Sequence, residues 1–184
     1  MTISNKKRAF IVGVLILIAY SMLTYSITKN IALGVITDFI SGIAVIGIPI
    51  LMFPIFNTKG IQNINSAYIV SRFIEGILMI FGGVMILNTS LEKYRNFIYE
   101  HIHIYFFITG ALFFYILLYR TQIVPKFISI WGIIATIMLL FITAAGLFGI
   151  GSPILKALVI PIVLNEFFLA IWLMVKGFNI KKEK

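Results

Sequence analysis

The sequence predicts an all-α membrane protein, a bundle of six transmembrane helices joined by short loops. Of the 184 residues, 61% are apolar and 11% are charged, whereas soluble domains average about 45–50% and about 25%. A soluble domain of this length has too little interior to bury so much apolar surface. The composition therefore excludes a soluble enzyme, a disordered chain and a nucleic-acid-binding domain.

Six apolar runs approach the roughly 20 residues that a helix needs to cross a bilayer core of about 30 Å. They cover about residues 9–26, 34–56, 65–87, 102–119, 127–149 and 155–175. Apolar residues follow one another continuously in these runs and do not alternate with polar ones, which excludes a β-barrel. We therefore expect residues 1–184 to form a single integral membrane domain whose partner is the lipid bilayer.

The lysines and arginines between the runs predict the orientation. With the N-terminus inside, ten cations fall on inner segments: Lys6, Lys7, Arg8, Lys59, Arg120, Lys126, Lys176, Lys181, Lys182 and Lys184. Four fall on outer segments: Lys29, Lys93, Arg95 and Lys156. An excess of Lys and Arg marks the cytoplasmic side, so we expect a multi-pass protein of the cell membrane with both termini in the cytoplasm. The net charge of +9 then reflects topology and not a nucleic-acid partner.

Several ionisable residues lie inside the apolar runs, where charge is costly and usually functional. Tyr68, Arg72 and Glu75 are spaced four and three apart, which places them on one helix face. Glu166 follows Asn165 in the sixth run. At 1.5 Å per residue, Glu75 and Glu166 both lie about 15 Å from the ends of their runs. Asp38 shares a stripe of small residues in the second run and is a possible third acid.

One arginine for two glutamates leaves a negative charge without compensation, so either one carboxyl is neutral or a cation sits beside it. This balance favours a protein that binds or transports a small molecule, a cation or a proton. The candidate site residues are Arg72, Glu75, Glu166, Asp38, Tyr68 and Asn165. In the alternative interpretation, Arg72 pairs with Glu75 or Glu166 only to lock helix packing, in a structural or accessory protein of stress or immunity.

Enzymatic chemistry has little support in the sequence. There is no cysteine, and His101 and His103 form an i, i+2 pair, which supplies too few ligands for a metal and points in two directions. We interpret both histidines as interfacial polar residues, and we expect no metal and no cofactor. A lipid-acting enzyme could use only the two glutamates as acid and base. The sequence does not predict an oligomeric state.

Three motifs together resemble a known family. They are Ala67-Tyr68-x-x-x-Arg72-x-x-Glu75, Leu118-Tyr119-Arg120-x-x-x-Val124-Pro125-Lys126 and Glu166-x-x-x-x-x-Trp172-Leu-x-x-Lys176-Gly177-Phe178. In order and spacing they are similar to a family of uncharacterised prokaryotic membrane proteins, domain of unknown function 4386, which usually has Arg at the place of Lys126. The resemblance implies a multi-pass membrane protein without an established activity, and it singles out Arg72, Glu75 and Glu166.

Overall fold

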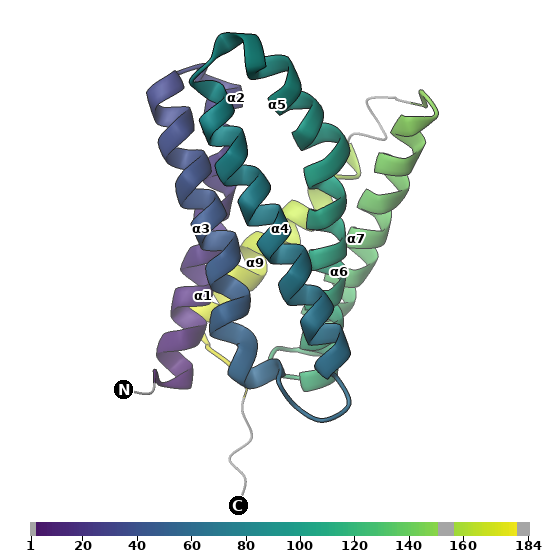
Figure 1. Ribbon diagram of the computed structural model, residues 1–184. Helices are drawn as coiled ribbons and strands as arrows, with labels where there is room; N and C mark the ends of the chain where they lie inside the picture. Colours follow the sequence, from purple (N-terminus) through teal and green to yellow (C-terminus); the bar gives the residue numbers. More distant parts are fainter. Residues whose placement is uncertain (1–2, 151–156, 180–184) are drawn as a thin grey trace, which may run out of the picture.

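The computed structural model describes residues 3–150 and 157–179, and these residues form helices and short connections (Figure 1). The helical segments are α1 (Asn5–Ala19), η1 (Tyr20–Leu23), α2 (Thr24–Thr28), α3 (Ile31–Phe56), α4 (Gln62–Ile86), η2 (Thr89–Leu91), α5 (Glu92–Ile98), η3 (Tyr99–His103), α6 (Ile104–Thr121), α7 (Lys126–Leu147) and α9 (Ile160–Val175). The all-helical class predicted from the sequence is confirmed for this part of the chain.

Five helical stretches are long and apolar enough to cross a membrane, which indicates a membrane-embedded bundle. They are Asn5–Thr28, Ile31–Phe56, Gln62–Ile86, Glu92–Thr121 and Lys126–Leu147. The remaining apolar helix, α9, has 16 residues and is about 24 Å long at 1.5 Å per residue. The predicted sixth span began at residue 155, and residues 155–156 lie outside the described part. A sixth crossing stays a prediction.

The fourth span differs from the prediction, which began it at residue 102. The helix begins at Glu92 and runs without interruption through the π-helical turn η3 to Thr121. The added turns carry Arg95, which the sequence placed among the outer connections, into the interior, where its side chain is 3% exposed and pairs with Asp38. This ion pair explains why the helix extends beyond its apolar stretch.

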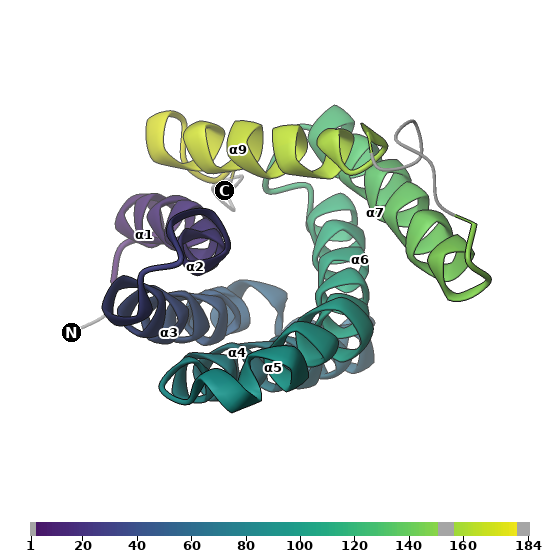
Figure 2. The ribbon, with the colours of Figure 1, turned by 90° about the horizontal axis from the view of Figure 1, so that it is seen from above.

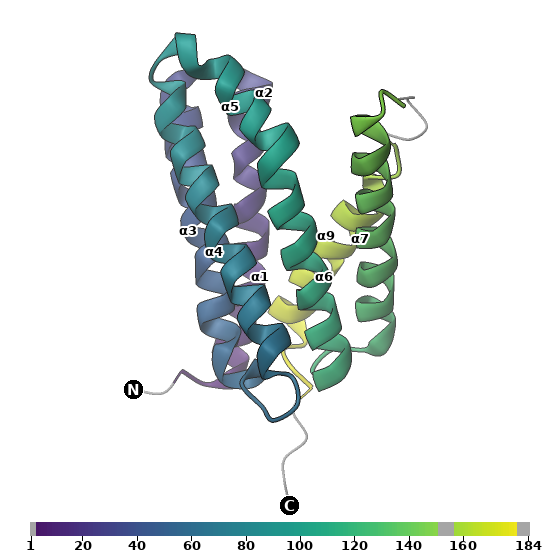
Figure 3. The ribbon, with the colours of Figure 1, turned by 45° about the vertical axis from the view of Figure 1, so that its right-hand side comes forward.

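The helices form a closed ring. Each packs against the next in the order α1, α3, α4, α6, α7 and α9, and α9 packs back against α1. Seen from above, these helices are arranged around a common centre (Figure 2). α9 is strongly inclined to the other helices (Figures 2 and 3), so it spans the side of the ring between α1 and α7.

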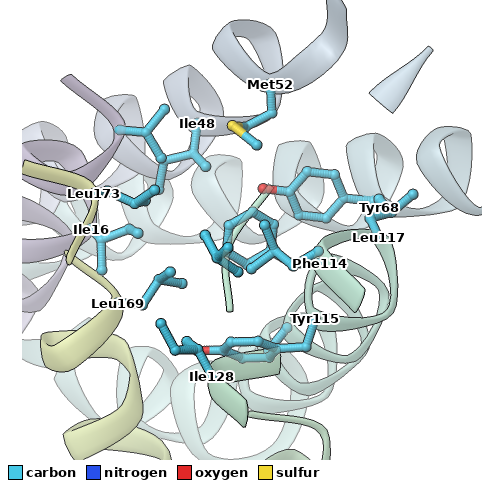
Figure 4. Packing of buried hydrophobic residues seen from close by; sticks show 14 of the residues in the cluster. Ile16, Ile48, Met52, Tyr68, Phe114, Tyr115, Leu117, Ile128, Leu169 and Leu173 are labelled. Carbon is cyan, nitrogen blue, oxygen red and sulfur yellow. The ribbon is translucent and has the colours of Figure 1, made fainter. Parts of the chain in front are cut away.

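The apolar core fills the half of this ring that lies nearer the start of α1. It contains Val12 from α1, Met52 from α3, Leu117 from α6, Ile128 from α7 and Leu173 from α9. Figure 4 shows Tyr68, Phe114 and Tyr115 reaching from α4 and α6 toward Ile48 and Leu169. These five side chains form the upper layer of the core, where the core meets the space above it.

Two glycines bring the backbones of α3 and α4 into contact next to Glu75. A Cβ on Gly42 would lie 2.6 Å from the carbonyl oxygen of Gly76, and a Cβ on Gly76 would lie 2.7 Å from that of Gly42. Neither position accepts a side chain unless the helices separate. This contact fixes the distance between α3 and the helix that carries Arg72 and Glu75.

We expect Gly76→Ala to lower the free energy of unfolding by about 1–3 kcal/mol, the usual cost of overpacking. The matched control is Gly146→Ala, because a Cβ there meets nothing within 4 Å. Thermal unfolding of both purified variants in detergent measures the difference. Equal melting temperatures would contradict the close contact between α3 and α4.

The orientation can be tested because the natural chain has no cysteine. Lys59 follows α3 at the end with the start of α1, and Lys93 lies on α5 at the other end; both are exposed. If the termini are cytoplasmic, a membrane-impermeant maleimide will label Lys93→Cys in intact cells and Lys59→Cys only after permeabilisation. The opposite pattern would reverse the predicted orientation.

Candidate functional site

A cavity of about 710 Å³ occupies the half of the ring that the apolar core leaves unfilled. Every helix of the ring contributes to its wall. Leu23, Glu100 and Leu147 also line it and are exposed, so the cavity reaches the surface at the end remote from the start of α1. Its volume lies within the roughly 300–1,000 Å³ typical of small-molecule sites.

Arg72 and Glu75 form an ion pair in the wall of this cavity. Arg72 Nη1 donates to Glu75 Oε2 at 2.9 Å, and both residues belong to α4. The guanidinium lies 5.9 Å from the ring centre of Tyr68 and 5.6 Å from that of Phe107. Gly110 makes room for it, since a Cβ there would lie 3.0 Å from Arg72 Nε. The sequence predicted this pair as one of two alternatives, and the structure has Glu75 as the partner.

Glu166 reaches the same cavity from α9 and pairs differently. Its Oε2 accepts a hydrogen bond of 2.6 Å from the Tyr20 hydroxyl of η1. Among residues 3–150 and 157–179, no Lys, Arg or His nitrogen lies within 4.0 Å of this carboxyl. Two of the three glutamates that line the cavity, Glu75 and Glu166, are buried, while Glu100 is exposed at its mouth. The one arginine in the lining is paired with Glu75, so the described residues place no cationic nitrogen within 4.0 Å of Glu166.

The buried part of the wall also carries several phenols and the imidazole of His103. The hydroxyls of Tyr68, Tyr105 and Tyr115 are buried without a hydrogen-bond partner in the described structure, and all three residues line the cavity. His103 Nε2 lies 4.0 Å from Glu75 Oε1. Buried polar atoms usually have partners, so these groups can hydrogen-bond a molecule in the cavity.

Asp38 belongs to a different cluster. Arg95 Nη2 donates to its Oδ2 at 2.8 Å, and the Tyr99 hydroxyl donates to the same oxygen at 3.1 Å. The Arg95 guanidinium lies 5.0 Å from the ring centre of Tyr25 and 4.3 Å from that of Tyr99. Asp38 does not line the cavity. The structure therefore compensates this acid within the helix packing and does not bring it to Glu75 and Glu166.

Asn165 is also separate from the cavity. Its Nδ2 donates to the carbonyl oxygen of Ile128 at 3.0 Å, which joins α9 to α7. This bond helps to fix α9 in its inclined position, with the neighbouring Glu166 in the cavity wall. The candidate residues thus divide into a cavity group, formed by Tyr68, Arg72, Glu75 and Glu166, and two packing residues, Asp38 and Asn165.

The interpretation of both histidines as interfacial is wrong for His103, which is buried and stacks on Tyr99 with ring centres 5.0 Å apart. His101 is exposed, and both histidines are among the residues that line the cavity. Sequence reasoning also missed Tyr20 and Tyr115 as cavity residues. Tyrosine hydroxyls inside apolar runs were the available signal, because such hydroxyls need a partner.

The two ion pairs at the end of the bundle remote from the start of α1 differ in burial, and this predicts different effects on stability. Asp38→Asn leaves Arg95 buried without a counter-charge, and we expect a loss of about 3–5 kcal/mol. Glu92→Gln breaks the exposed contact with Lys29, 3.5 Å long, and we expect a loss of at most about 1 kcal/mol. Denaturant or thermal unfolding in detergent compares them, and equal losses would refute the difference.

Comparison with known proteins identifies the family of this chain but assigns it no activity. No curated protein and no solved structure matches this chain. A family model described as "Domain of unknown function (DUF4386)" matches residues 11–177. That range includes the ion pair of α4, Glu166 and its hydrogen-bond partner Tyr20. Since the match covers most of the sequence and agrees with the motifs around Arg72, Glu75 and Glu166, the chain belongs to the DUF4386 family.

Proposed function

We propose that this membrane protein binds a small organic cation in the cavity and that the Glu166 carboxylate is the counter-ion. One observation carries the proposal: Glu166 is 8% exposed, lines the cavity and has a phenol but no cation beside it in the described structure. A charged carboxylate in such a position is costly unless a positive charge accompanies it. A cationic ligand supplies that charge, and a proton replaces it when the ligand leaves.

The aromatic residues that line the cavity favour an organic cation over a metal ion as the ligand. Phe107, Tyr68, Tyr20 and Tyr115 line the cavity, and aromatic faces attract ammonium-type cations. Ca²⁺ and Mg²⁺ instead require several oxygen ligands around one point. The described residues contain no group of three His, Cys, Asp or Glu side chains that could hold a metal ion.

The geometry also argues against a purely structural polar cluster. Arg72 and Glu75 are three residues apart on one helix, so their ion pair cannot hold two helices in register. Asp38 and Arg95 join α3 to α5, and they lie outside the cavity lining. Helix locking by an ion pair is thus served by Asp38 and Arg95, and the Glu166 carboxyl keeps a hydrogen bond to Tyr20 and no ion-pair partner within 4.0 Å in the described structure.

Tetraphenylphosphonium is a suitable probe because it is an aromatic organic cation whose charge does not depend on pH. We expect saturable binding to the purified protein in equilibrium dialysis, and Glu166→Gln should weaken it about tenfold or more, the loss expected when a buried charged contact disappears. The matched control is Glu92→Gln, which removes a carboxyl that lies outside the cavity lining and should leave affinity unchanged.

Equal affinities of wild type and Glu166→Gln would overturn the proposal. Transport is the further possibility. Uptake of the probe into proteoliposomes, driven by an imposed proton gradient and lost in Glu166→Gln, would assign a transporter. Binding without uptake would assign a receptor or accessory protein that holds the cation at a fixed site.

A further inference from the structure

A second concave site lies at the opposite end of the bundle. It is a groove of about 1,040 Å³ between the start of α1, the end of α3, the end of α6 and the segment at Asn179. It shares no residue with the cavity of Glu166, so its role is independent of the proposed function.

The charged side chains of the groove are basic. Arg8 and Arg120 line it, together with the amides of Asn5, Gln122 and Asn179, and none of the described residues that line it carries a carboxylate. Arg8 Nη1 donates to Asn5 Oδ1 at 2.9 Å, while Arg8 Nε is buried and has no hydrogen-bond partner in the described structure. Within residues 3–150 and 157–179, neither arginine lies within 4.0 Å of a carboxylate.

Two guanidinium groups that have no counter-ion in the described structure are suited to binding a phosphate group. The planar N–H donors of arginine match the geometry of the phosphate oxygens. The surroundings favour a lipid as the source. Pro54, Ile55 and Ile123 give the groove an apolar wall, along which an acyl chain can lie. Basic pockets between helices on the cytoplasmic side commonly hold anionic headgroups, and the excess of Lys and Arg at this end predicts that side.

We propose that this groove, which we call the Arg8–Arg120 groove, binds the phosphate of an anionic phospholipid. The headgroup would contact the start of α1 and the end of α6, which lie apart in the sequence. A bound phosphate therefore joins the first helix of the ring to the helix that carries Tyr115 and Gly110.

Native mass spectrometry of the detergent-purified protein tests this with phosphatidylglycerol and phosphatidylcholine. We expect one phosphatidylglycerol to be retained and phosphatidylcholine to be lost. The variant Arg8→Gln/Arg120→Gln should weaken phosphatidylglycerol retention at least about tenfold. The control Lys29→Gln/Lys93→Gln removes the same charge at the other end and should retain the lipid. Arg120 is exposed, so Arg120→Gln alone provides a folded variant with a several-fold loss.

Each other outcome is decisive. Equal loss in both double variants would mean diffuse attraction to basic charge and would overturn the site. Retention of phosphatidylglycerol in Arg8→Gln/Arg120→Gln would also overturn it. A titration with inorganic phosphate distinguishes a lipid headgroup from free phosphate as the ligand. If phosphate raises the melting temperature only when both arginines are present, and no lipid is retained, the groove binds phosphate but not a phospholipid.

Discussion

The cost of an unpaired charge inside a bilayer organises the polar residues of this protein. Asp38 is compensated by Arg95, and Arg72 by Glu75, at 2.8 and 2.9 Å. Glu166 has only the Tyr20 hydroxyl. Because an ion buried without a partner costs several kcal/mol, the first two acids are satisfied by the chain and the third depends on what enters the cavity. The functional proposal follows from this difference in partners.

The closed ring makes that difference possible. Among the described helices none passes through its centre, so side chains decide which part is filled. Large aromatic and branched residues fill the half at the start of α1, where Phe114 stacks on Tyr68 with ring centres 5.4 Å apart. Above this layer the wall carries polar groups that cannot pack as a dry core at low cost. The aromatic layer is therefore both the top of the core and the floor of the cavity.

The sequence predicted the helical membrane class and most helix positions, because hydropathy reports burial in lipid directly. It also predicted that Arg72 and Glu75 share one face, since that depends only on helical periodicity. It could not choose between Glu75 and Glu166 as the partner of Arg72, because that choice depends on the inclination of α9. The sequence also placed Arg95 in an outer connection. Its burial depends on the continuity of the helix through η3 and on its partner Asp38, which is 57 residues away in the sequence. Both are features of the tertiary structure that hydropathy does not report.

The two ends of the bundle carry opposite unpaired charge. The cavity contains an acid without a cation, and the Arg8–Arg120 groove contains two cations without an acid. Within the described chain no oppositely charged side chain lies within 4.0 Å of either, but only Glu166 is buried, since Arg8 is half-buried and Arg120 is exposed. α1 connects the two sites, since Arg8 lies in its first turns and Tyr20 directly follows its last residue. Both sites therefore draw a residue from one continuous helical stretch, Asn5–Thr28.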